Sequence, residues 1–182
     1  MKILRSAVRV YSALLVIALI WVYFQDRLSW SLFWPLEIEA LVLQGAAGLA
    51  TALFMILLSI YASKNFLWAQ MLEDEVSKIL VPLQVWEIGA IAILSGVAEE
   101  VFFRGAFQPV FGLVPASLLF GLAHLVPRKE FLPWSFYAVF AGFLLGSVFE
   151  LTRSLLPVVL AHTLVNFVLI VILNRRHYMQ PA

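Results

Sequence analysis

Cysteine is absent from this chain of 182 residues, which excludes a disulfide framework, a thiolate nucleophile and a cysteine-based metal site. Charge is also scarce. Asp, Glu, Lys and Arg together make up 13% of the residues, whereas ordinary soluble domains contain about 25%. Hydrophobic residues make up 63% of the chain. This composition predicts an integral membrane protein.

Long apolar runs occupy most of the sequence, and a membrane-spanning helix needs about 20 such residues. We predict an all-α, polytopic bundle with about six transmembrane helices, at residues 10–24, 36–62, 83–107, 116–126, 131–149 and 153–173. Residues 64–81 instead place apolar side chains at helical spacing and charges on the other side, which predicts an amphipathic helix at the membrane surface. No repeat or long linker divides the chain, so we expect one membrane domain over residues 1–182.

The positive residues predict the orientation, because cytoplasmic loops are enriched in Lys and Arg. We find no small-x-small cleavage site after the first apolar run, so we interpret it as a retained span. If the amino terminus is cytoplasmic, only Arg27 and Arg153 lie in segments on the opposite side. We therefore expect both termini in the cytoplasm. The cytoplasmic segments then hold Lys2, Arg5, Arg9, Lys64, Lys78, Arg128, Lys129, Arg175 and Arg176.

Polar residues inside the predicted spans are few, and such residues usually face a bundle interior and have a function there. Residues four apart share a helix face, so Glu100 can pair with Arg104. At 1.5 Å per residue, Glu99, His124 and His162 each lie about 12–16 Å from the outer end of a helix, at one common level. The candidate site residues are Glu99, Glu100, Arg104, His124, His162 and Asn166.

Three motifs occur in order on separate apolar helices: Glu99-Glu100-x-x-x-Arg104, Phe120-x-x-x-His124 and His162-x-x-x-Asn166. Together they resemble the signature of the CPBP family, the membrane-embedded proteases that include the Ras-converting CAAX endopeptidase and many bacterial relatives. The resemblance covers roughly residues 85–172. CAAX proteases of eukaryotes and archaea are usually described with eight spans, so this chain resembles the core of the family.

The resemblance implies an intramembrane, glutamate-dependent endopeptidase that needs no cofactor. Carried over to this sequence, Glu99 is the general base that takes a proton from water, and His124 helps to hold that water. Arg104 fixes Glu100, while His162 and Asn166 stabilise the oxyanion. A buried carboxylate and donors aimed at the developing oxyanion are chemically suited to these roles.

Other mechanisms have less support in the sequence. An aspartyl protease needs two aspartates within spans, and the two in this chain, Asp26 and Asp74, lie outside them. A serine mechanism with Ser147 and His162 would leave both glutamates unexplained. A zinc ion bound by Glu99, His124 and His162 is a further alternative, because imidazole and carboxylate ligands make catalytic zinc sites.

The alternative without chemistry is a membrane scaffold or partner-binding protein of the same fold. In that interpretation Glu100 and Arg104 form a structural ion pair, and His162 and Asn166 make hydrogen bonds between helices. For the protease, the expected partners are the lipid bilayer and a membrane-anchored or exported protein or peptide, prenylated CAAX proteins being one option. We expect no nucleic-acid partner, and a bacterial or archaeal cytoplasmic membrane as the location.

Overall fold

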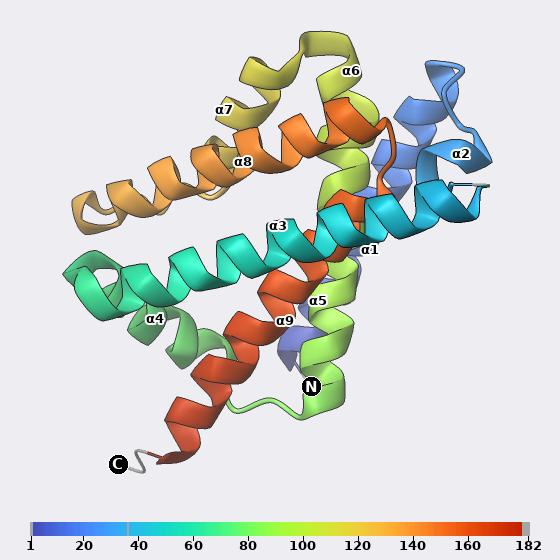
Figure 1. Cartoon of the computed structure of the whole chain (residues 1–182). Coiled ribbons are helices and arrows are strands. Elements are labelled where there is room, and N and C mark those ends of the chain that lie inside the picture. Colours follow the sequence, from blue (N-terminus) through green and yellow to red (C-terminus); the bar gives the residue numbers. More distant parts are fainter. Residues whose placement is uncertain (1, 36, 180–182) are drawn as a thin grey trace.

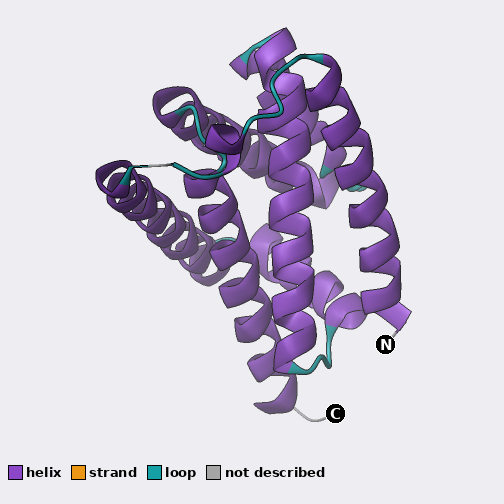
Figure 2. Cartoon of the chain, turned by 90° about the vertical axis from the view of Figure 1, so that its right-hand side faces the viewer, coloured by secondary structure: helices purple, strands orange, loops and turns teal. Residues whose placement is uncertain are grey.

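The computed structural model describes residues 2–35 and 37–179, and all regular structure within these ranges is helical. In Figure 1, α5 stands beside α9 and α1, α3 crosses α9, and α7 and α8 run together along the top. The view in Figure 2 shows the same bundle from its right-hand side. The predicted all-α bundle is confirmed. Its elements are α1 (Lys2–Phe24), α2 (Trp30–Phe33), α3 (Ile38–Asn65), α4 (Leu67–Leu80), α5 (Val85–Glu100), η1 (Val101–Phe107), α6 (Gln108–Phe111), α7 (Leu113–Ala123), η2 (Lys129–Phe131), α8 (Leu132–Thr152) and α9 (Leu156–Met179).

Four helices among the described residues are long and apolar enough to cross a membrane: α1, α3, α8 together with η2, and α9. The number is five if α4 and the helix Val85–Phe111, which meet at an angle of 111°, form one broken span. The prediction of about six spans was therefore too high. The difference between six and five spans lies in α7. Its 11 residues extend only about 16 Å, roughly half of a hydrocarbon core of about 30 Å.

The segments α5, η1 and α6 form one continuous helix from Val85 to Phe111. Its middle part, η1, is a π-helix that starts directly after Glu99 and Glu100, and such wide turns are frequent at functional sites. The helix continues past Pro109 to Phe111. The chain reverses at Gly112, whose φ of 88° suits glycine and few other residues.

Small residues allow the helices around the site to approach closely. A Cβ atom added to Gly96 on α5 would lie 2.4 Å from Oγ1 of Thr163 on α9. The Gly-x-x-x-Gly face of α8, formed by Gly142 and Gly146, packs against α7, since a Cβ atom at Gly142 would lie 3.0 Å from Cα of Ser117. These contacts bring α5, α7, α8 and α9 together around the candidate site residues.

The predicted amphipathic helix is present as α4, and its polar side is tied to neighbouring elements. Glu73 pairs with Arg176 on α9. Glu75 pairs with Lys78 at 3.2 Å and with Arg128, in the segment after α7, at 3.4 Å. Lys78 and, to a smaller extent, Arg128 hold the pKa of the exposed Glu75 carboxyl below its usual range. The apolar side of α4 faces the bundle.

Candidate active site

A buried ion pair and a histidine form the base of the site. Nη1 of Arg104 donates to Oε1 of Glu100 at 3.0 Å, as the i,i+4 spacing predicts. The same carboxylate oxygen lies 2.6 Å from Nδ1 of His162 on α9. The side chains of Arg104 and Glu100 are 1% and 0% exposed, so the pair is removed from water. Glu100 thereby joins the α5–η1 helix to α9.

The Arg104 guanidinium is held by groups beyond Glu100. Its Nη2 donates to the carbonyl oxygen of Gly142 on α8 at 3.1 Å. Its Cζ atom lies 4.7 Å from the ring centroid of Phe120 on α7, at the distance of a cation–π contact. Arg104 therefore connects three helices, and Phe120 contributes more to the site than apolar packing.

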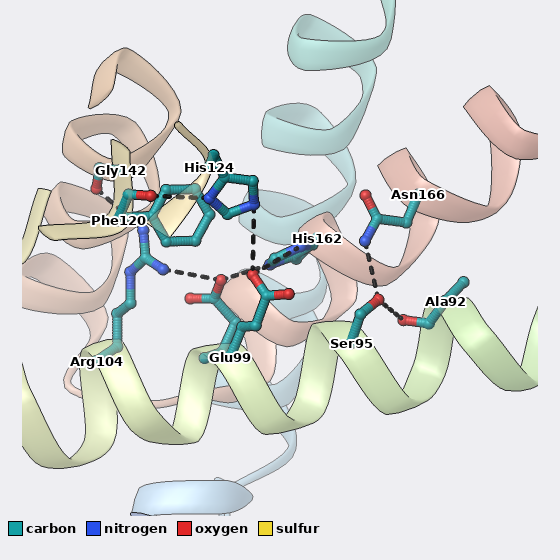
Figure 3. Close-up of polar contacts among 10 residues, drawn as sticks. Ala92, Ser95, Glu99, Arg104, Phe120, His124, Gly142, His162 and Asn166 are labelled. Carbon is teal, nitrogen blue, oxygen red and sulfur yellow. Dashed lines mark hydrogen bonds and ion pairs between the residues drawn. The ribbon is translucent and has the colours of Figure 1, made fainter. Parts of the chain in front are cut away.

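Glu99 occupies a different position from its neighbour Glu100. Its Oε2 atom lies 3.8 Å from Nε2 of His124 and 3.9 Å from Nε2 of His162 (Figure 3). Within the described residues this buried oxygen has no hydrogen-bond partner. Both separations exceed hydrogen-bond length and leave room for a bridging water. Glu99 is thus the carboxylate with an unused acceptor facing two imidazoles.

His124 lies at the carboxyl end of α7, not within a membrane-spanning helix. Its Nδ1 atom is 2.8 Å from the carbonyl oxygen of Phe120, which can only accept a hydrogen bond. We therefore assign the proton to Nδ1, and this assignment orients Nε2 toward Glu99. The side chain is 26% exposed, compared with 11% for Glu99, so the site is most accessible on the His124 side.

Asn166 lies one turn of α9 beyond His162 and contacts a different partner. Its Nδ2 atom donates to Oγ of Ser95 at 2.9 Å, and Ser95 donates in turn to the Ala92 carbonyl oxygen at 3.2 Å. In Figure 3 this group lies to the side of Glu99, away from Arg104. The structure therefore brings five of the six predicted residues into one cluster and places Asn166 next to it.

A cavity of about 380 Å³ adjoins this side of the site. Its lining is mostly apolar and comes from α1, α3, α4, α5, α8, α9 and the segment after α7. The polar groups that line it include Ser95 and Asn166 beside the site, Glu73 and Arg176 where α4 meets α9, and the hydroxyls of Tyr11, Ser59 and Tyr137. The cavity connects the neighbourhood of the cluster with the inner face of α4.

Three contributors were not among the predicted site residues. Ser95 precedes Glu99 by four residues, so its helical spacing was an available signal. Gly142 acts through its carbonyl oxygen, which no side-chain pattern reveals. Tyr11 on α1 interacts with Glu99 through its hydroxyl and lines the cavity, although α1 carries none of the three motifs.

The comparisons with known proteins agree with this arrangement. Residues 81–168 match the Rce1-like family model, whose description is type II CAAX prenyl endopeptidase Rce1-like. The match covers just under half of the chain and supports the resemblance to the CAAX protease family. All six predicted site residues lie in this Rce1-like segment, whereas α1 to α4 precede it. No curated protein and no solved structure gave a significant match.

The Rce1-like match supports, in general terms, a CAAX-type intramembrane endopeptidase with a membrane-associated protein as substrate. The family prediction made from the three motifs is confirmed. Among the residues that the structure describes, no group of three or more His, Asp or Glu side chains is arranged to hold a metal ion.

Proposed function

We propose that the chain is a glutamate-dependent intramembrane endopeptidase, which hydrolyses a peptide bond near the carboxyl terminus of a membrane-associated protein or peptide. The observation that carries this proposal is the position of Glu99. Its buried Oε2 is free of hydrogen bonds to described residues and lies 3.8 and 3.9 Å from two imidazole nitrogens. A water molecule bound there contacts a base and two orienting groups at once.

In this mechanism Glu99 accepts a proton from that water as the water oxygen attacks the scissile carbonyl carbon. The second hydrogen stays on the water oxygen and donates a hydrogen bond to Nε2 of His124, which is free to accept it because Nδ1 carries the ring proton and hydrogen-bonds to the Phe120 carbonyl oxygen. Glu99 then delivers its proton to the leaving amine as the carbon–nitrogen bond breaks. General acid–base catalysis of this kind contributes typically 10²–10⁴-fold to a rate.

Glu100 and Arg104 are assigned a positioning role. Oε1 of Glu100 contacts both the Arg104 guanidinium and Nδ1 of His162, and the Glu100 side chain is fully buried. It is therefore poorly placed to act as a base. Its bond to Nδ1 fixes the His162 ring so that Nε2 points toward Glu99.

His162 and Asn166 are the proposed oxyanion donors. His162 can donate from Nε2 when it is protonated, with its charge balanced by the two glutamates. Asn166 uses one of its two amide hydrogens on Ser95 and retains a second. One donor aimed at the developing oxyanion contributes about 3–4 kcal/mol in known hydrolases. The Ser95–Asn166 pair also lines the cavity, where a substrate backbone can approach it.

We propose an exported or membrane-anchored protein as the substrate, because the polar cluster is predicted slightly toward the non-cytoplasmic half of the membrane. Prenylated proteins, bacteriocin precursors and carboxy-terminal sorting tails are candidates from the family. Two other functions are tested against this one. They are a catalytically inactive scaffold of the same fold and a zinc-dependent protease with the same residues.

The test compares new carboxyl and amino termini of membrane proteins in cells that express wild type, Glu99→Gln or His124→Ala. Glu39→Gln is a matched control, since Glu39 is an exposed carboxylate in the first turn of α3. We expect a set of termini that is present with wild type and the control and absent with both site variants. Full biological function of both site variants at normal expression would refute the protease and favour the scaffold.

A further inference from the structure

The first helix is fixed against the motif-bearing helix on both sides of Tyr11. Near its start, Leu4 and Ala7 pack on the cluster that contains Ile88 and Ile91 of α5. Near its end, Nε2 of Gln25 donates to the carbonyl oxygen of Ala106 at 2.9 Å. The contacts run in the same direction along both helices, so α1 and α5 are parallel. Tyr11 therefore lies between the two sets, at the level of Ser95 and Glu99.

Trp21 strengthens the second set of contacts. Its ring meets those of Phe102 and Phe107 edge to face, with centroids 6.0 Å apart in each pair. Val22 is fully buried beside Gly105, where an added Cβ atom would lie 3.6 Å from Cγ2 of Val22. With α1 held at both ends, it cannot slide along α5, and the level of the Tyr11 side chain is set.

Tyr11 differs from its neighbours on α1 because it faces the protein interior. Val8 and Val10 are 42% and 60% exposed and have the orientation expected for contact with lipid. Tyr11 is half-buried, lines the cavity together with Ser95 and Asn166, and interacts with Glu99. The Tyr11 side chain is therefore on the side of α1 that faces the cavity and the proposed base.

The other groups that face Glu99 leave it without a hydrogen-bond donor. His124 and His162 lie 3.8 and 3.9 Å away, beyond hydrogen-bond length. Arg104 interacts with Glu99 electrostatically, but its donors are directed at Glu100 and Gly142. A tyrosine O–H is a neutral donor that can supply the missing bond without adding charge.

We propose that Tyr11 is a positioning residue of the active site, whose hydroxyl donates a hydrogen bond to the Glu99 carboxylate and holds it toward the two imidazoles. This inference rests on the proposed role of Glu99 as the base. It also makes α1, which lies outside the Rce1-like segment, a part of the working site. A hydrogen bond donated to a carboxylate stabilises its charged form relative to its protonated form.

The test is an infrared titration of the purified protein in detergent with a chelator present. The carbonyl stretch of protonated Glu99 is assigned as the band that disappears in Glu99→Gln. Tyr11→Phe removes the hydroxyl and keeps the ring. We expect the midpoint of Glu99 protonation to rise by about one pH unit in Tyr11→Phe, a tenfold change in proton affinity. The acid limb of Glu99-dependent cleavage should move by the same amount.

Tyr137→Phe is the matched control, because Tyr137 lines the same cavity but bonds to Ser59 at 2.7 Å. It should leave the midpoint unchanged. An unchanged midpoint in Tyr11→Phe overturns the proposal, as does a loss of cleavage that is equal at every pH. The infrared shift does not depend on turnover. If it occurs while Glu99→Gln cleaves as fast as wild type, the Tyr11–Glu99 bond stands and the proposed function fails.

Discussion

Removal of the Arg104 side chain tests the buried ion pair at the base of the site. Arg104→Met leaves the fully buried carboxylate of Glu100 without its cation and the Gly142 carbonyl without its donor. Breaking a buried pair from one side typically costs about 3–5 kcal/mol, because an uncompensated charge stays out of water. We therefore expect Arg104→Met to lower the free energy of unfolding by about 3–5 kcal/mol.

The double variant Glu100→Gln/Arg104→Met separates this cost from a general packing defect. Glutamine has nearly the shape of glutamate and its amide oxygen can still accept from Nδ1 of His162. The glutamine amide nitrogen, which takes the place of the buried Oε2 of Glu100, then has no acceptor among the described residues, at a cost of about 1–3 kcal/mol. The double variant should therefore be more stable than Arg104→Met alone.

Reversible unfolding of the purified variants in detergent measures both quantities, provided that the transition is two-state. A double-mutant cycle with Glu100→Gln gives the coupling between the two residues. The reasoning is refuted if Arg104→Met unfolds within about 1 kcal/mol of wild type. A double variant that is no more stable than the single one would equally refute it.

Two further predictions concern packing and metal. Gly96→Ala should separate α5 from α9, because the new Cβ atom would lie 2.4 Å from Oγ1 of Thr163; we expect a loss of about 1–3 kcal/mol of stability and slower Glu99-dependent cleavage. Gly45→Ala has open space around the added atom and should leave both quantities near wild type. Strong chelation of the purified enzyme should not change its cleavage rate, and a loss of activity that zinc restores would establish the zinc mechanism instead.

Much of the fold follows from patterns that the sequence displays directly. Apolar runs identify α1, α3, α8 and α9, and the alternation of charged and apolar residues over 64–81 identifies α4. The contact between Glu100 and Arg104 is local, so the four-residue spacing was sufficient to predict it. Local signals of this kind need no knowledge of how the helices pack.

The short helix α7 could not be recognised in the same way. An apolar segment such as 116–126 has the same composition whether it crosses the membrane or reverses partway through it. The length of α7 is set by the turn at Gly112 at one end and by the end of the helix at His124 at the other. The sequence also gives no sign of the π-helical turn after Glu100, because its residues fit ordinary helical spacing.

The tertiary contacts of the site also exceed what spacing can predict. The family resemblance assigned His162 and Asn166 one shared role, the stabilisation of the oxyanion. In the structure His162 contacts Glu100 and Asn166 contacts Ser95, because successive turns of α9 lie beside successive turns of α5. The roles of both residues in catalysis stay predictions, as does that of His124.

The most direct test of the account is the rate at which purified protein, reconstituted in lipid, cleaves a substrate identified from the wild-type-dependent termini. Wild type, Glu99→Gln and the control Glu39→Gln are compared at equal folded concentration. The account predicts that Glu99→Gln loses at least about 10²-fold in rate, the lower end of what a general base contributes, while Glu39→Gln matches wild type. Cleavage by Glu99→Gln at the wild-type rate would contradict the central claim that Glu99 activates the attacking water.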